Sequence, residues 1–212
     1  MKDTTIEILN DLINRHGELE VCREDILGAY SLMESAFKSG KKLLVCGNGG
    51  SAADSEHIVG ELMKCFKKKR AIDGDLYAAL GDCGEDGRLL REHLEGALPA
   101  VALTSHLSLS TAFSNDAEPS LVFAQQLNGL GEEGDVLFAI STSGNSQNCV
   151  LAATLAKAKG LKTVALTGER ESRLSALCDV TVRVCASETY LIQEYHLPIY
   201  HALCAMLEEE FF

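Results

Sequence analysis

Two side chains capable of acid–base chemistry stand four residues apart in the first half of the sequence. His57 and Glu61 occupy positions i and i+4 of a stretch with helical spacing, so both side chains are expected on one face of a helix. An imidazole and a carboxylate placed this way can move protons on a bound substrate. Hydrogen-bonded pairs on ordinary helix surfaces show the same spacing, so the pair alone leaves both interpretations open.

A second group of reactive side chains lies near the C-terminus. Gln193, Glu194, His196 and His201 fall within a segment predicted to form the last helix. Gln193 and His201 are separated by roughly 12 Å along a straight helix and by an angle of about 80°. They can reach one ion only if the helix bends or the side chains lean together, and otherwise they serve sites in different subunits. Pro198 predicts a kink between them unless the helix restarts there.

Two short segments rich in glycine and serine are each predicted to join a strand to a helix. The first is Gly47–Ala52 (GNGGSA) and the second is Ser141–Ser146 (STSGNS). Backbone amides at a helix N-terminus carry partial positive charge and bind anions. The second loop offers four hydroxyls and no lysine or arginine, which suits a phosphate monoester that must bind and leave. If both loops follow parallel strands, they meet in one crevice at the carboxyl ends of those strands.

Other interpretations of the two loops remain open at this point. The first loop fits the dinucleotide fingerprint G-x-G-x-x-A, with Ala52 in the last position. That fingerprint requires an acidic residue about 20 residues later at the end of a second strand. Lys67–Arg70 and an irregular segment stand there instead, which argues against a nicotinamide enzyme. A glycine turn without a ligand is the plainer alternative for the first loop, and Ser146 could simply cap a helix.

Strands and helices alternate along most of the chain. The near-continuous apolar character of the strands predicts a parallel sheet with helices on both faces, a flavodoxin-like doubly wound α/β fold. An N-terminal pair of helices, broken at Gly17, is predicted to precede the sheet within residues 1–40. A turn is predicted at Ser114–Asp116. The predicted strands are 43–46, 99–103, 135–140, 162–166 and 180–184, and the later helices are 51–66, 107–113, 120–130, 146–159, 173–177 and 188–210.

Residues 67–97 break the alternation and are interpreted as an inserted, exposed excursion with a short helix near Leu89–Leu94. The run Lys67–Arg70 at its start is interpreted as a solvated helix end. The run Glu208–Glu210 is interpreted as an exposed acidic tail. We assign no chemistry to the insertion from the sequence.

Length and composition limit the classes of protein that are possible. The 212 residues are 46% hydrophobic and indicate a single domain, and no apolar run approaches the length of a membrane span. The net charge of −12 argues against nucleic acid as a partner. None of the eight cysteines is in C-x-x-C spacing and no secretory signal is visible. We therefore expect reduced thiols and a cytoplasmic protein.

Taken in order along the chain, these motifs resemble the phosphoheptose isomerases, which have the SIS (sugar isomerase) fold. The resemblance covers roughly residues 40–66 and 98–212. It rests on Cys46–Asp54, His57, Glu61, Gly134–Ser146, Leu166–Gly168, Ile192–Glu194 and His201. It implies a single SIS domain over residues 1–212 and a cytoplasmic homotetramer with active sites between subunits. It also implies conversion of sedoheptulose 7-phosphate to glycero-manno-heptose 7-phosphate through an enediol, in heptose and carbohydrate biosynthesis.

The resemblance also implies a role for each matching residue. Glu61 and His201 would move protons between C1, C2 and their oxygens. One zinc ion per subunit would be held by His57, Glu61, Gln193 and His201. The substrate would be contacted by Asn48, Gly49, Gly50, Ser51, Glu61, Asn115, Asp116, Ser141, Thr142, Ser143, Ser146 and Gln193, with the four hydroxyl residues of the second loop on the phosphate.

Two departures from the family pattern bear on the substrate. His106 stands where these enzymes usually have an aspartate, and it is either an ordinary loop histidine or a change in the acid–base set or in the sugar preference. Residues 67–97 replace a short connection and could cover the site, extend a subunit contact or bind a partner. The alternatives are an isomerase of another phosphosugar and a non-catalytic SIS module. The replication-initiation proteins that bind DnaA are such modules with an eroded acid–base set, whereas His57, Glu61, Gln193 and His201 are all present here.

Overall fold

A five-stranded parallel sheet organises the chain, in a computed structural model that describes all 212 residues. The strands are β1 (Leu43–Gly47), β2 (Ala100–Ala102), β3 (Val136–Ile140), β4 (Lys162–Thr167) and β5 (Val180–Arg183). Their order in the sheet is β2-β1-β3-β4-β5, so β1 and β3 lie side by side in its interior. This is the order of a doubly wound fold, and it confirms the predicted fold class.

Each strand at the centre of the sheet buries side chains on both faces. On β1, Leu43 and Val45 belong to one hydrophobic cluster, whereas Leu44 and Cys46 belong to the other. Successive side chains of a strand point to opposite faces, so a strand covered on both sides must be apolar throughout. The near-continuous apolar runs in the sequence have this cause.

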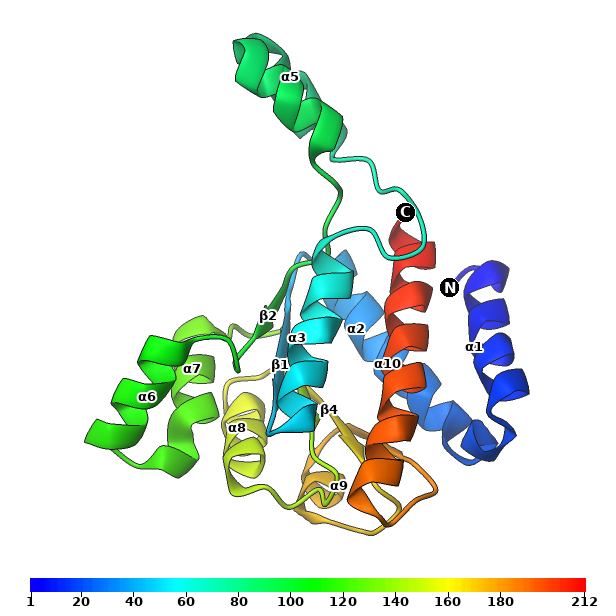
Figure 1. Ribbon diagram of the computed structural model, residues 1–212, viewed down its shortest axis with the longest axis vertical. Coiled ribbons are helices and arrows are strands. Elements are labelled where there is room, and N and C mark those ends of the chain that lie inside the picture. Colours follow the sequence, from blue (N-terminus) through cyan, green and yellow to red (C-terminus); the bar gives the residue numbers. More distant parts are fainter.

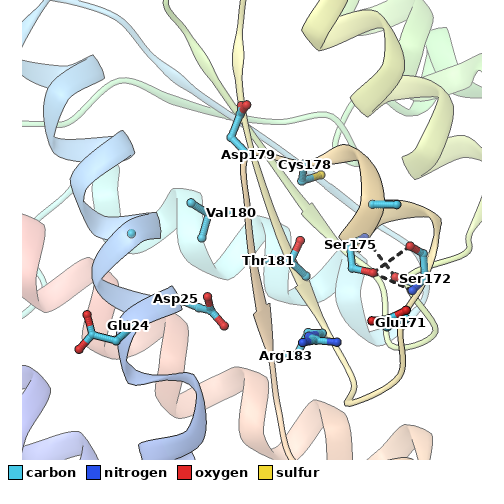
Figure 2. Close-up of a pocket in the computed structure, with 12 residues that line it drawn as sticks. Glu24, Asp25, Glu171, Ser172, Ser175, Cys178, Asp179, Val180, Thr181 and Arg183 are labelled. Atoms are coloured by element: carbon cyan, nitrogen blue, oxygen red, sulfur yellow. Dashed lines mark hydrogen bonds between the residues drawn. The ribbon is translucent and has the colours of Figure 1, made fainter.

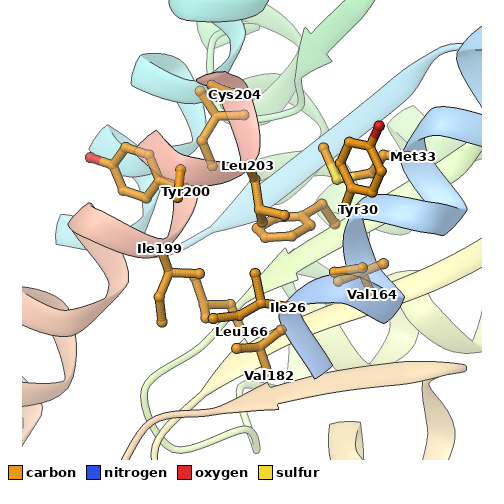
Figure 3. Close-up of a cluster of buried hydrophobic side chains, with 14 of the residues drawn as sticks. Ile26, Tyr30, Met33, Val164, Leu166, Val182, Ile199, Tyr200, Leu203 and Cys204 are labelled. Atoms are coloured by element: carbon orange, nitrogen blue, oxygen red, sulfur yellow. The ribbon is translucent and has the colours of Figure 1, made fainter. Parts of the chain in front are cut away.

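Four helices and one 3-10 turn cover the larger cluster. They are α1 (Asp3–Arg15), η1 (Gly17–Cys22), α2 (Arg23–Lys38), α3 (Gly50–Met63) and α10 (Thr189–Phe211). Figure 3 shows Ile26 and Met33 of α2 together with Ile199 and Leu203 of α10 in this cluster. Pro198 lies inside α10, which runs uninterrupted through it.

The opposite face is covered by α7 (Val122–Leu130), α8 (Gln147–Ala158) and α9 (Arg173–Leu177). Helix α6 (Leu107–Asp116) lies at the outer side of this layer (Figure 1), and the 3-10 turn η3 (Pro119–Leu121) connects it to α7. The turn predicted at Ser114–Asp116 is wrong, because these residues form the last turn of α6.

None of the helices has the length and apolar character needed to cross a membrane.

The inserted segment forms a projecting arm of two short helices. Helix α4 (Gly74–Ala79), the 3-10 turn η2 (Leu80–Asp82) and α5 (Gly84–His93) stand away from the body of the molecule in Figure 1. The arm is exposed as predicted, but it is more regular than the single short helix expected near Leu89–Leu94. Asp73 accepts hydrogen bonds from the Asp75 and Leu76 amides at the start of α4, and the Arg91 guanidinium lies 3.9 Å from the centre of the Tyr77 ring.

At the root of the arm, the interpretation of two charge runs as solvated is wrong for one residue in each run. The charge runs predict solvated positions for Arg70 and Glu208, yet both side chains are buried. The Arg70 Nε lies 2.8 Å from Glu208 Oε1, and its other nitrogens donate to the carbonyls of Glu61 and Leu62. The chain leaving α3 is therefore anchored to the end of α10 by an ion pair.

His196 on α10 is fully buried, and neither ring nitrogen has a hydrogen-bond partner. Burial lowers the pKa of this imidazole to about 4, because the charged form loses its hydration. In the unfolded chain a histidine has a pKa of about 6.5. The neutral ring therefore contributes stability that is fully present above about pH 6.5.

We expect that contribution to be lost as the pH falls from about 6.5 towards 4. Urea unfolding of the wild type at pH 7.0 and pH 5.0 should show a lower free energy of unfolding at pH 5.0. In His196→Leu the difference between the two pH values should shrink, whereas replacing the exposed His93 by leucine should leave it unchanged. An equal pH dependence in the wild type and His196→Leu would contradict the assignment.

Candidate functional site

The first loop connects β1 to α3 and begins at the carboxyl end of an interior strand. Gly49 has a φ of 57°, a conformation that favours glycine, and it stands at the N-cap of α3 without a side-chain cap. A Cβ on Gly50 would lie 2.6 Å from the side-chain amide nitrogen of Gln193, so a larger residue there would displace the Gln193 side chain from the loop. Asn48, Gly49 and Gly50 are exposed, while Ser51 is buried in the first turn of the helix.

The second loop connects β3 to α8 and has the same relation to the sheet. Ser146 is the N-cap residue of α8, but its hydroxyl lies 3.0 Å from the hydroxyl of Ser141 and makes no capping bond. The alternative that Ser146 serves only as a cap is therefore wrong. Gly144 has a φ of 64°, and a Cβ there would collide with Ser172. Ser146 thus leaves the N-terminus of α8 uncapped, although the Cys149 amide donates to Asn148 Oδ1, and backbone amides at a helix N-terminus can bind an anion.

The two loops lie side by side, as their positions after parallel strands predict. Asn48 of the first loop and Asn148 of α8 exchange two hydrogen bonds, of 2.9 and 2.8 Å. The sequence gives no signal for Asn148, because an asparagine in a helix has no distinctive pattern. The pair joins the loops across the carboxyl ends of β1 and β3.

A cavity of about 200 Å³ opens beside the second loop. Thr142 and Ser143 line it together with Gly168, Arg170 and Ile192. The Gly168 amide donates to the Thr142 carbonyl at 3.0 Å, so the segment after β4 closes one side. The lining also includes the carboxylates of Glu169 and Glu171, so the groups in this hollow that can bind an anion are the Arg170 guanidinium and hydroxyls such as those of Thr142 and Ser143.

The acid–base residues lie further along α3, where α10 packs against it. The His57 Nε2 is 3.2 Å from Glu61 Oε1, as the i, i+4 spacing predicts. The ring of His201 on α10 lies edge-on to that of His57, with 4.9 Å between the ring centres. The Nε2 atom of His201 is buried without a hydrogen-bond partner, and burial lowers the pKa of this imidazole. The structure thus brings His57, Glu61 and His201 together.

Two further side chains, which were not among the predicted site residues, join this cluster. Tyr200 on α10 is buried, and its hydroxyl lies 3.1 Å from His57 Nδ1 and 3.2 Å from Asp54 Oδ1. Burial raises the pKa of the Asp54 carboxyl, and burial beside Asp54 raises the pKa of the Tyr200 hydroxyl. The only sequence signals were that Asp54 precedes His57 by about one helical turn and that Tyr200 adjoins His201.

Three predicted substrate residues and one departure from the family pattern lie away from the His57 cluster. Gln193 rests against Gly50, and Gly50 precedes His57 by roughly 10 Å along α3. Asn115 and Asp116 are exposed and bond to each other at the end of α6, which packs on η3 and α7. His106 precedes α6, and its Nδ1 lies 2.6 Å from the side-chain oxygen of Gln126. One subunit therefore does not gather the whole predicted set.

A larger cavity, of about 520 Å³, lies away from all of these residues. Figure 2 shows it between α2, which contributes Glu24 and Asp25, and the β5 edge with Thr181 and Arg183. It lacks the two loops and the imidazoles that isomerisation would need. We therefore place the candidate site at the loops and the α3–α10 contact.

Comparison with known proteins agrees with this architecture. Residues 10–86 and 90–168 match the SIS domain family. A phosphoheptose isomerase from a Nitratiruptor species is 41% identical over 192 residues, which cover 91% of this chain and 89% of that protein. The solved structure of a phosphoheptose isomerase from Neisseria gonorrhoeae superposes with a TM-score of 0.74 at 33% identity, covering 94% of each chain. A phosphoheptose isomerase structure from Francisella tularensis gives 0.72 at 29% identity, covering 98% of this chain and 94% of the other.

The chain therefore belongs to the SIS domain family. The relatives described above are phosphoheptose isomerases, and they match it over nearly their full lengths. The resemblance noted in the sequence is thus confirmed, and the family match begins earlier, at residue 10, and extends into the arm.

Proposed function

We propose that this protein converts sedoheptulose 7-phosphate to glycero-manno-heptose 7-phosphate, a step of heptose biosynthesis. The observation that carries the proposal is the cluster of His57, Glu61 and His201 on the helix that follows a substrate loop and on its neighbour α10. A relative that is 41% identical and bears the name phosphoheptose isomerase supports the choice of substrate.

The reaction requires a base that removes a proton from C1 of the ketose and an acid that protonates the carbonyl oxygen at C2. We assign these proton transfers to Glu61 and His201. The resulting enediol becomes the aldose when a proton is added at C2 and the hydroxyl proton at C1 is removed. The hydroxyls of Ser141, Thr142, Ser143 and Ser146 and the free amides of α8 would hold the phosphate.

Zinc is part of this proposal, and three of its four predicted ligands are adjacent. Bond lengths of about 2.1 Å at a tetrahedral zinc place two ligand atoms roughly 3.4 Å apart. The 3.2 Å between His57 Nε2 and Glu61 Oε1 is close to this spacing, and the unpartnered Nε2 of His201 is a third donor. As they stand, no three His, Cys, Asp or Glu side chains converge on one point, so His201 would have to rotate. When bound, zinc would polarise the carbonyl of the sugar as a Lewis acid.

We further propose that the enzyme acts as a cytoplasmic homotetramer that binds a phosphosugar and no nucleic acid. Gln193 and Gly50 of the first loop lie at one end of the α3–α10 contact, and the His57 cluster lies further along it. Association of subunits would let Gln193, Asn115 and Asp116 of one chain complete the site of another. All eight cysteines are free thiols, which supports a reducing compartment, and the charge of −12 disfavours a nucleic-acid partner.

Proton NMR of sedoheptulose 7-phosphate in D₂O, with and without added zinc, tests the proposed reaction. We expect the aldose phosphate to appear with deuterium at C2 and the rate to depend on zinc. No conversion and no exchange by folded protein would overturn the heptose assignment. The same assay on shorter sugar phosphates would then separate an isomerase of another phosphosugar from a module that only binds one.

The second loop, Ser141–Ser146, is called the phosphate loop below, and it gives a separate prediction. Ser143→Ala should raise KM about 10-fold or more with little change in kcat, because a hydrogen bond to a charged group contributes about 1.5–3 kcal/mol. Steady-state kinetics checks this, with Ser108→Ala on the exposed face of α6 as the matched control. A loss confined to kcat would contradict a role for Ser143 in phosphate binding.

A further inference from the structure

Tyr200 connects two residues of α3 that stand about one helical turn apart. Its side chain reaches from α10 past apolar neighbours that include Met33, Ile58 and Leu203. A hydroxyl carried into such surroundings costs free energy unless it finds hydrogen-bond partners. Its two partners are Asp54 and His57, one of which belongs to the candidate site. Phenylalanine would fill the same space, so the hydroxyl itself calls for an explanation.

The hydrogen atoms of this network can be assigned from its geometry. The ionised Asp54 carboxylate only accepts, so the Tyr200 hydroxyl donates its hydrogen to Asp54 Oδ1. The Tyr200 oxygen then acts as an acceptor towards His57 Nδ1, which must carry a hydrogen. The opposite ring atom, Nε2, is thereby left to face Glu61 Oε1 at 3.2 Å.

This arrangement makes Nε2 the end of His57 that binds a cation. A bare Nε2 and the Glu61 carboxylate are both acceptors, and two acceptors at 3.2 Å need a proton or a metal ion between them. The hydroxyl of Tyr200 and the carboxylate of Asp54 therefore act on the site through His57, since no hydrogen bond joins either of them to Glu61 or His201.

We propose that Tyr200, held by Asp54, is a positioning residue that keeps the hydrogen of His57 on Nδ1 and turns Nε2 towards Glu61. The metal-binding consequence of this proposal rests on the zinc site of the proposed function, whereas the placement of the hydrogen does not. Outer hydrogen bonds of this kind fix the tautomer of a ligating imidazole and raise its basicity.

Tyr200→Phe tests the proposal by removing one oxygen and keeping the ring. Long-range ¹H–¹⁵N spectra of the zinc-free protein at pH 8.5 report which ring nitrogen of His57 carries hydrogen. In the wild type we expect a hydrogen on Nδ1. In Tyr200→Phe the remaining partner is Glu61, so His57 should shift to the form with hydrogen only on Nε2. Zinc affinity, measured by competition with a chromophoric chelator, should fall about 10- to 100-fold.

Tyr30→Phe is the matched control, because Tyr30 is an equally buried tyrosine of the same hydrophobic core on α2. It should change neither the His57 spectrum nor zinc affinity. Circular dichroism establishes that both variants fold.

A wild-type His57 with a bare Nδ1, or the same His57 spectrum in the wild type and Tyr200→Phe, would overturn the proposal. A wild type that shows the expected spectrum but binds no zinc or isomerises no heptose phosphate would instead contradict the proposed function. The proposal that Tyr200 keeps the hydrogen of His57 on Nδ1 would still be supported in that case.

Discussion

Glu61→Gln is expected to lower kcat for sedoheptulose 7-phosphate at least 100-fold, because a positioned general base contributes about 10²- to 10⁴-fold. Glutamine keeps the size and polarity of the side chain but takes up no proton, so it cannot act as a base. The phosphate loop and its cavity lie outside the substitution, so binding of the sugar phosphate should be retained. Steady-state kinetics and isothermal titration calorimetry measure the two quantities separately.

Glu56→Gln provides the matched control for this experiment. This variant makes the same glutamate-to-glutamine change on the same helix, at a position where the side chain is exposed. Its kcat and KM should match those of the wild type. If Glu61→Gln keeps more than about a tenth of the activity, Glu61 is not the base. If it loses binding together with turnover, the carboxylate has a role in holding the substrate or a metal.

The sheet could be predicted because each of its interior strands can be recognised from a short segment of the sequence. Its interior strands are covered on both faces, so segments such as Val136–Ile140 are apolar at every position and end at loops with glycine or hydroxyl residues. Parallel strands bring their carboxyl ends to one edge, and the meeting of the two loops follows from that geometry. The bonds between Asn48 and Asn148 confirm it.

The acid–base cluster could be predicted only in part, because it depends on how two helices pack. The i, i+4 spacing predicts that His57 lies beside Glu61, but the position of His201 follows from the packing of α10 on α3. That packing also adds Tyr200, whose hydroxyl lies against residues more than 140 positions away in the sequence. No periodicity within one segment carries this information.

Charge runs were the least reliable guide to burial. Lysines and glutamates are nearly always exposed, so the runs Lys67–Arg70 and Glu208–Glu210 predict solvated side chains. One member of each run is buried because the two side chains satisfy each other and the backbone around them. Glu208 accepts hydrogen bonds from the amides of Phe66, Lys67 and Lys68 as well as from Arg70.

Glu208→Gln is therefore expected to lower the free energy of unfolding by about 3–5 kcal/mol, the usual cost of breaking a buried ion pair from one side. The Arg70 side chain would keep its charge with none of its atoms exposed, and the amide group of glutamine would direct hydrogens at donors. Burial raises the pKa of Glu208, but the Phe66 and Lys67 amides and Arg70 outweigh it and hold the pKa below its ordinary value. The native structure thus favours the ionised carboxylate.

Urea unfolding at pH 7 measures this loss, and Glu209→Gln is the matched control. Glu209 is the next residue of α10 and pairs with Lys68 nearer the surface, where such pairs contribute about 0–1 kcal/mol. Arg70→Met should cost a similar amount to Glu208→Gln, and the double variant should cost less than the two together, because neither charge is then left unpaired. Additive losses would show that the two side chains stabilise the root of the arm independently. Coupled losses would show that Arg70 and Glu208 stabilise the root of the arm as one ion pair, beside the backbone of Glu61.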